Sequence, residues 1–195
     1  MERDASFRRL GGYAAYLVAA FSILYAVVYL GFVRTDATNA NAAALAWALI
    51  AAGSLSAALA TAALGSFIGG VAGAFLIAFG VAYSVLATTH GVFAAIGDLQ
   101  GFADLELSPT DPRGLATFGL AGIWSLLAGI ELRARPGLRS VYWQLAVVGG
   151  IDLILLFIAT AIGSTPLILV TGGLASVILG PVFWAMTGRL LTAER

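Results

Sequence analysis

Three side chains stand out as groups capable of chemistry in an otherwise apolar sequence: Asp152, His90 and Tyr83. Asp152 lies inside a long apolar segment, 13 residues after Arg139, and therefore roughly 20 Å along a helix from that basic end. An aspartate at this depth costs on the order of 3 kcal/mol to insert, and it normally faces the protein interior and marks a functional site. We expect Asp152 either to bind a proton, a cation or a ligand, or to lock two helices together through a hydrogen bond.

His90 and Tyr83 are seven residues apart and therefore share one face of a helix. The same face carries glycine and alanine at spacings of three and four residues, which is typical of a helix that packs inward. We predict a ligand pocket near one membrane surface, lined by Tyr83 and His90. The alternative is that His90 only hydrogen-bonds a loop carbonyl. Gly149, which lies about one turn before Asp152, belongs to the predicted ligand site on a second helix.

Several kinds of chemistry are excluded by the residue types that are missing. The sequence has no cysteine, its ten basic residues are all arginine, and it has a single histidine. Disulfides, thiolate catalysis, lysine Schiff bases and two-histidine metal ligation are therefore ruled out within the chain. We predict no metal site and no catalytic residue, and the sequence identifies no cofactor. The formal net charge is zero, so no overall field attracts nucleic acid.

The composition is that of an integral membrane protein. Of the 195 residues, 61% are hydrophobic and 10% are charged, and the mean hydropathy is +0.98. Soluble domains carry roughly 25% charged residues, so a soluble globular fold is excluded. The sequence predicts an all-α, polytopic membrane helix bundle in which residues 1–195 form a single integral membrane domain.

Six stretches are long enough to cross the hydrocarbon core, which takes about 20 apolar residues per helix. Short breakers separate neighbouring stretches, as at Gly65-Ser66 and at residues 163–166. The predicted spans are residues 11–33, 42–64, 67–89, 114–130, 141–162 and 167–188.

The distribution of arginine predicts the orientation of these spans. With the N-terminus inside, eight of the ten arginines lie on the cytoplasmic side and only Arg34 and Arg113 lie outside. Such a bias is the usual signature of the inward-facing loops, so both termini are predicted to be cytoplasmic. The absence of lysine and the abundance of alanine and glycine favour a GC-rich bacterium, and hence its inner membrane.

Small residues recur at the spacing that allows helices to approach closely. Gly65, Gly69 and Gly73 form one such row, and further rows lie in the fourth and sixth predicted spans. These rows predict packing within the chain or, alternatively, a contact between copies of it. Pro181, inside the sixth span, predicts a kink because it removes a backbone hydrogen bond.

An internal repeat is one interpretation of the glycine pattern. Residues 69–73 resemble residues 172–176 at an offset of 103, which would pair the first three spans with the last three. With three spans in each half, the repeat would be a 3+3 inverted repeat of the kind found in secondary transporters. The alternative is that glycine- and alanine-rich helices match by chance.

The loop at residues 91–113 is the longest segment outside the predicted spans. Apolar residues recur in it at positions 93, 96, 99 and 102, a helical spacing that predicts a short amphipathic helix on the outer interface. Thr110 or Asp111 is placed to cap the fourth span.

Two functions remain open at this stage, and an enzyme is the less favoured third. The first is a small membrane protein that binds or transports an apolar or amphipathic ligand, a cation or a proton through an intramembrane site around Asp152. The second is a non-catalytic subunit or scaffold of a larger membrane complex. The predicted partners are the lipid bilayer, a lipid-like or small-molecule ligand, and further copies or other subunits. An intramembrane enzyme would need a nucleophile and a base that the sequence does not bring together.

Overall fold

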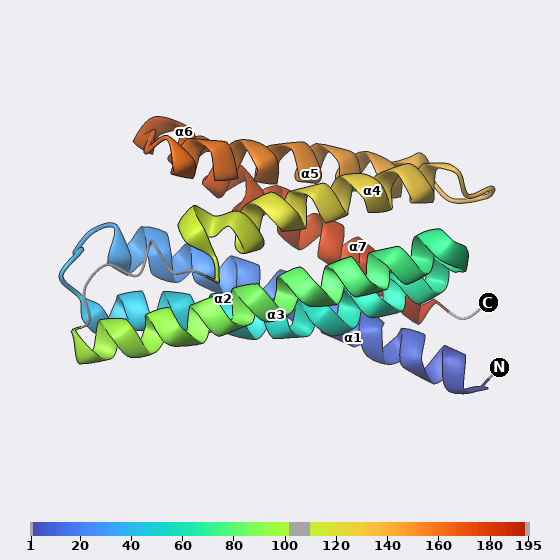
Figure 1. Cartoon of the computed structure of the whole chain (residues 1–195), viewed down its shortest axis with the longest axis horizontal. Coiled ribbons are helices and arrows are strands. Elements are labelled where there is room, and N and C mark those ends of the chain that lie inside the picture. The colour runs from blue at the N-terminus through green and yellow to red at the C-terminus, as the bar shows by residue number, and fades with distance from the viewer. Residues whose placement is uncertain (1, 102–109, 194–195) are drawn as a thin grey trace.

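The computed structural model describes residues 2–101 and 110–193, with side chains from residue 5 onward, and all the regular structure in these ranges is helical. Six helical segments are long and apolar enough to cross a membrane, which confirms the predicted helix bundle. The segments lie alongside one another, and both chain ends lie at the same end of the bundle (Figure 1). Between 17 and 44% of the most apolar stretch of each segment is buried. The remaining apolar side chains point outward, where a bilayer would cover them.

The first three spans are nearly continuous helices. They are α1 (Glu2–Val28) with its π-helical continuation η1 (Tyr29–Val33), α2 (Ala40–Ile68) and α3 (Gly70–Gln100). Asn39 caps α2, because its side-chain oxygen accepts a hydrogen bond from the backbone N–H of Ala42 at 3.0 Å.

The last three spans are interrupted more often. A single 3₁₀ turn precedes the fourth span, and two π-helical segments lie within the fourth and sixth spans. In chain order the elements are η3 (Pro112–Gly114), π-helical η4 (Leu115–Leu120), α4 (Ala121–Arg133), α5 (Ser140–Ala161), α6 (Thr165–Leu174), π-helical η5 (Ala175–Leu179) and α7 (Gly180–Thr192).

The turn between the second and third spans lies later in the sequence than the glycine pattern suggested. We expected the break at Gly65-Ser66, but α2 continues to Ile68 and the chain reverses at Gly69 and Gly70. Both glycines have positive φ angles, 71° and 63°. Only glycine adopts that backbone without strain, so this pair, and not Gly65, can end one helix and start the next.

The predicted interfacial helix is not a separate element in the described residues. Helix α3 runs without a break through His90 to Gln100 and ends at Gly101, which has a left-handed backbone. Gly91 does not break it, because it lies against α2: an added Cβ there would be 3.0 Å from the backbone nitrogen of Ala51. The apolar positions at 93, 96 and 99 therefore belong to the third span. Residues 102–109 lie outside the described part of the chain.

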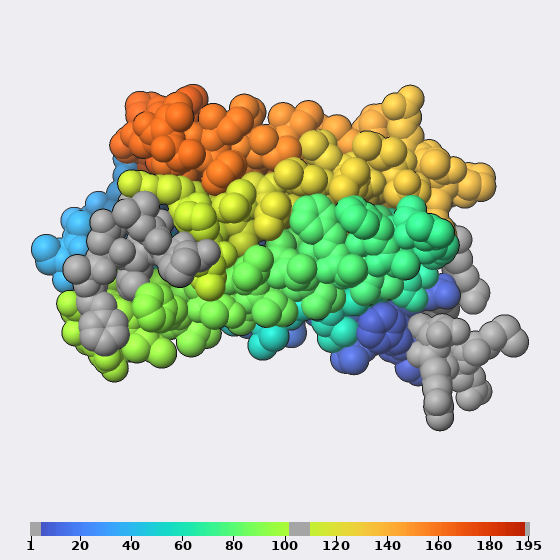
Figure 2. Space-filling model, viewed as in Figure 1, coloured from blue at the N-terminus to red at the C-terminus, as the bar shows by residue number. Residues whose placement is uncertain are grey.

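Helix pairs approach closely through facing glycines. In the predicted row, Gly65 of α2 faces Gly73 of α3, because a Cβ added to Gly65 would be 2.7 Å from the carbonyl oxygen of Gly73. Gly122 of α4 and Gly150 of α5 face each other, since a Cβ added to either would be 2.8 Å from the carbonyl oxygen of the other. Gly12 of α1 and Gly188 of α7 meet in the same way. Figure 2 shows the side chains of α4 and of the N-terminal half of α3 meeting along one face of the bundle. The contact between Gly65 and Gly73 shows that the predicted row packs within the chain, whereas the other two glycine pairs lie outside the predicted rows.

The structure gives no support to the internal repeat. Gly69 and Gly70 form the turn between α2 and α3, whereas Gly172 and Gly173, their counterparts at the offset of 103, lie inside α6. The π-helical segments do not recur at that offset either. Because glycine is common in this chain, with 24 copies, similar short strings arise without structural equivalence.

The sixth span divides its packing between the two halves of the bundle. Its first part, α6, packs mainly on α5, whereas its second part, α7, packs mainly on α1. The change of partner occurs at η5, just before Pro181. Pro181 lacks the N–H that would continue the α-helical hydrogen bonds, so the predicted irregularity takes the form of a π-helical segment.

Candidate functional site

A cluster of aromatic rings forms the centre of the bundle. Trp124 is 1% exposed, and its indole N–H donates a hydrogen bond to the carbonyl of Leu76 at 2.9 Å. The ring stacks on Trp184, with centroids 5.9 Å apart, and contacts the tilted ring of Tyr83 at 6.1 Å. Gly80 makes this arrangement possible, because a Cβ at that position would be 2.8 Å from the Trp124 nitrogen. The cluster joins α3, α4 and α7.

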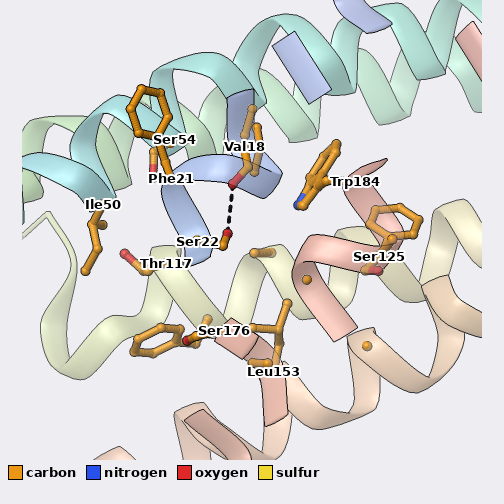
Figure 3. Close-up of a pocket in the computed structure, with 18 of the residues that line it drawn as sticks. Val18, Phe21, Ser22, Ile50, Ser54, Thr117, Ser125, Leu153, Ser176 and Trp184 are labelled. Atoms are coloured by element: carbon orange, nitrogen blue, oxygen red, sulfur yellow. Dashed lines mark hydrogen bonds between the residues drawn. The ribbon is translucent and has the colours of Figure 1, made fainter. Parts of the chain in front are cut away.

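A cavity of about 170 Å³ lies beside this aromatic cluster, and we call it the inner cavity (Figure 3). Its walls come from α1, α2, α3, η4, α4, α5, η5 and α7. Gly149 opens one wall, since no atom lies within 4 Å of where its Cβ would be. The residues that line the inner cavity are buried or half-buried, and the cavity is partly open at the surface of the bundle.

The polar groups in the inner cavity are neutral. Ser22 and Ser125 donate hydrogen bonds to backbone carbonyls, at 2.9 Å to Val18 and 2.8 Å to Ala146. Within the described residues, the hydroxyls of Ser54 and Ser176 form no hydrogen bond. A bound molecule with an acceptor oxygen would find these donors unoccupied.

Trp184 adds a neutral donor to the same space. Its indole N–H has no partner in the part of the chain that the structure describes, in contrast to that of Trp124. The nitrogen edge of the Trp184 ring points into the cavity in Figure 3.

A second cavity of about 290 Å³, the outer cavity, adjoins the first. It lies nearer the end of the bundle opposite the chain termini, between α1–η1, η3–η4, α5 and α6–η5. The two cavities share part of their walls and therefore lie side by side. The shared lining residues are Tyr25, Thr117, Phe118, Leu156 and Ser176.

The charged residues that line this space belong to the outer cavity. Asp111, 1% exposed, accepts hydrogen bonds from the backbone N–H of Ala116 at 2.5 Å and from the Thr117 hydroxyl at 2.5 Å. It therefore caps η4, as predicted from the sequence. Arg113 lies beside it in the cavity wall with a φ of 55°, which is an uncommon backbone for a residue other than glycine.

His90 lines the outer cavity from α3. It is buried, and its ring meets Trp47 edge to face at a centroid distance of 5.0 Å. Its Nδ1 has no hydrogen-bond partner. Nδ1 therefore bonds no loop carbonyl within the described residues, and the alternative that His90 hydrogen-bonds a loop carbonyl stays a prediction.

All three π-helical segments of the described chain line these cavities. Tyr29 and Leu30 of η1 and Val177 of η5 line the outer cavity, while Thr117 of η4 and Ser176 of η5 line both. A π-helical turn carries one extra residue and is poorer in hydrogen-bond geometry than an α-helical turn, and such turns are frequent at functional sites. Their convergence marks this space as the part of the bundle that departs most from regular packing.

The predicted site residues are divided among different parts of the structure. Tyr83 and Gly149 line the inner cavity, and His90 lines the outer cavity. Asp152 is buried, as expected, with 6% of its surface exposed, but it lines neither cavity. Its Oδ2 atom is enclosed and has no hydrogen-bond partner. The expected helix-locking hydrogen bond to Asp152 is therefore absent from the described residues.

The sequence did not single out several residues that shape the cavities. Tyr25 was inconspicuous because aromatic residues are common in membrane spans, and Trp184 was interpreted as part of an aromatic belt at the membrane surface. Arg113 was interpreted only as a marker of the outer loop. Pro181 was the one available signal for η5, since it fixes where the sixth span must lose its α-helical hydrogen bonds.

The described residues contain no cluster of three histidine, cysteine, aspartate or glutamate side chains that could hold a metal ion. No protein-family model, no curated protein and no solved structure matches this chain. The evidence for function is therefore the site itself.

Proposed function

We propose that this chain is a membrane protein that binds, and in the course of its function moves, a small apolar or amphipathic molecule in the two adjoining cavities. The observation that carries the proposal is the pair of adjoining, largely apolar cavities at which three π-helical segments converge. Ligand sites are typically concave, mostly apolar and furnished with a few polar groups. The free donors of Ser54, Ser176 and Trp184 supply such groups.

The site of the proposal is centred on the cavities and not on Asp152. Gly149 faces the inner cavity, whereas Asp152 lies on a neighbouring face of α5 and does not reach it. A cation or proton pathway through Asp152 has less support, because the carboxylate lines no cavity. The orientation with both termini in the cytoplasm and the location in a bacterial inner membrane remain part of the proposal and rest on the arginine bias and the composition.

The proposal is tested by filling the inner cavity without disturbing the packing around it. Gly149→Leu adds a side chain where no atom lies within 4 Å. Gly31→Leu is the matched control, because Gly31 also has open space around it but lines neither cavity. Each protein is purified in mild detergent, and the small molecules that co-purify are extracted and quantified by mass spectrometry.

We expect a defined apolar or amphipathic species to co-purify with the wild type and with Gly31→Leu. Gly149→Leu should retain at least tenfold less of it, a loss of about 1.4 kcal/mol in binding free energy. Equal retention by all three proteins would show that the species is bound elsewhere. A fixed set of co-purifying proteins without a bound small molecule would instead support the role of a subunit in a larger complex.

A further inference from the structure

The two adjoining cavities follow one another along the sixth span, and we call them together the slot. Ile168 of α6 lines its outer part and Trp184 of α7 lines its inner part. The 16 residues between them correspond to roughly 24 Å along a helix. One leaflet occupies half of a hydrocarbon core that is about 30 Å thick. The slot is therefore long enough to take a chain that extends through one leaflet.

The outer part of the slot reaches the surface on the side of the bundle. Leu30 of η1 and Val177 of η5 line the outer cavity and are 42% and 49% exposed. Both lie within membrane-spanning segments, so the surface they reach faces acyl chains and not water. Here α1 packs mainly on α2 and α7, whereas α6 packs mainly on α5. Helix α1 also packs on η5, so the side opening between α1–η1 and α6–η5 lies beside that contact, toward η1 and α6.

Polarity changes along the slot in one direction. The lining charges, on Asp111 and Arg113, lie in the outer cavity together with His90. The inner cavity has no charged lining residue and ends against the rings of Trp124 and Trp184. A molecule that matches this gradient has a polar head at the outer end and an apolar chain at the inner end.

The size of the slot restricts the number of chains. Each cavity is smaller than the roughly 300–1,000 Å³ of a typical small-molecule pocket, at about 170 and 290 Å³. The inner cavity is also the smaller of the two, and its lining residues are buried or half-buried. One chain can enter it, whereas the second chain of a phospholipid would have to remain outside.

We infer that the ligand is a single-chain amphiphile drawn from the bilayer, which enters sideways between α1–η1 and α6–η5. Its head stays near Asp111 and Arg113, and its chain lies in the inner cavity. This inference rests on the proposed function and adds the ligand class, the orientation and the route of entry.

Photocrosslinking tests the orientation and the ligand class. The probe is a monoacylglycerol with a diazirine near the methyl end of its chain, incorporated into vesicles that contain the protein. We expect saturable crosslinks to inner-cavity residues such as Leu153 and Trp184. The same probe with the diazirine near the glycerol should instead crosslink outer-cavity residues such as Trp47. A two-chain phosphatidylcholine with the methyl-end diazirine should crosslink outward-facing residues only.

The route is tested with cysteine variants, because the native chain has no cysteine. Val177→Cys places a thiol at the side opening, and Ile178→Cys places one on the neighbouring exposed residue, which lines neither cavity. Both variants are modified with a bulky maleimide before the probe is added. Modification at position 177 should slow inner-cavity crosslinking at least tenfold, whereas modification at position 178 should leave its rate unchanged.

The outcomes separate this inference from the proposed function. Saturable inner-cavity crosslinking that proceeds equally fast with both modified variants would overturn the sideways route. Saturable labelling of the inner cavity by the glycerol-end probe would overturn the orientation, and equal inner-cavity labelling by the two-chain lipid would overturn the ligand class. If no probe gives saturable labelling that Gly149→Leu abolishes, and no other small molecule co-purifies, the proposed function fails as well.

Discussion

Asp152 has a buried carboxyl group whose hydrogen-bonding capacity is not satisfied. It is buried in the middle of a membrane span, and its Oδ2 atom has no hydrogen-bond partner. Burying a polar group without a partner costs free energy that the fold must supply from its other contacts. Since Asp152 also lines neither cavity, neither ligand contact nor a helix-locking hydrogen bond accounts for it in the described residues.

Substitution of Asp152 should therefore not weaken the fold. Asp152→Asn keeps the shape of the side chain, and we expect its thermal unfolding midpoint in detergent to equal that of the wild type. Asp152→Leu removes the unpartnered polar group and should raise the free energy of unfolding by about 1–3 kcal/mol. The ligand that co-purifies should be unchanged in both. A lower midpoint for either variant would mean that the carboxylate has a partner that the fold requires.

The sequence predicted that Asp152 is buried inside the protein, but not that it lines neither cavity. Helical periodicity gives the face of a residue on its own helix, and residues three apart differ by about 60° around the axis. Gly149 and Asp152 therefore both lie on the side of α5 that faces the protein interior, but only Gly149 lines the inner cavity. Which neighbouring helix or cavity a side chain faces depends on how the spans pack against each other. The periodicity of a single helix carries no information about that packing.

At the scale of elements, the spans were predictable and their irregularities were not. Length and hydropathy set the six spans because backbone polar groups in lipid must be satisfied within a helix. The π-helical segments leave no comparable mark on hydropathy, since they keep the same apolar residues. The continuation of α3 through residues 93–100 was missed for a related reason: an apolar stripe at helical spacing fits both a surface helix and the end of a long span.

Two adjacent glycines of α5 should respond in opposite ways to the same substitution. A Cβ on Gly150 would be 2.8 Å from the Gly122 carbonyl oxygen and 2.9 Å from the Leu126 nitrogen. Gly150→Ala should lower the unfolding free energy by about 1–3 kcal/mol, because α4 and α5 must move apart. Gly149→Ala meets open space and should raise it by up to about 1 kcal/mol through helix propensity. Thermal unfolding of the two single variants checks this prediction. A lower free energy of unfolding in both variants would show that α5 tolerates no added volume at either position.

The start of η4 depends on Asp111. Its carboxylate accepts hydrogen bonds from the backbone N–H groups of Ala116 and Thr117 and from the Thr117 hydroxyl. Asp111→Ala leaves these donors unpaired and should cost about 1–2 kcal/mol of stability, as for other lost helix caps. Asp111→Asn keeps one acceptor oxygen and should cost less. Equal unfolding midpoints for wild type and Asp111→Ala would show that the cap contributes nothing.

At the scale of the whole molecule, the two halves of the bundle touch most closely at one end. Near the chain termini, Gly12 of α1 meets Gly188 of α7, and Arg135 donates a hydrogen bond to the Ile68 carbonyl while lying over the Phe67 ring at 4.5 Å. Toward the other end the adjoining cavities separate α1 from α5 and α6. The bundle is thus closed near its termini and hollow near the opposite surface, which suits a ligand supplied from one leaflet.

The arginine bias assigns the closed end to the cytoplasm, and this is tested by labelling single cysteines in the otherwise cysteine-free chain. Thr38→Cys lies in the loop between η1 and α2, at the hollow end, and Gly137→Cys lies in the loop between α4 and α5, at the closed end. Eight of the ten arginines lie at the closed end by the predicted threading, so the positive-inside rule places it in the cytoplasm. In intact cells a membrane-impermeant maleimide should label Thr38→Cys, whereas Gly137→Cys should react only after lysis. The reverse labelling pattern would place the cavity entrance in the cytoplasmic leaflet. The ligand would then come from that leaflet, and the route between α1–η1 and α6–η5 would be unchanged.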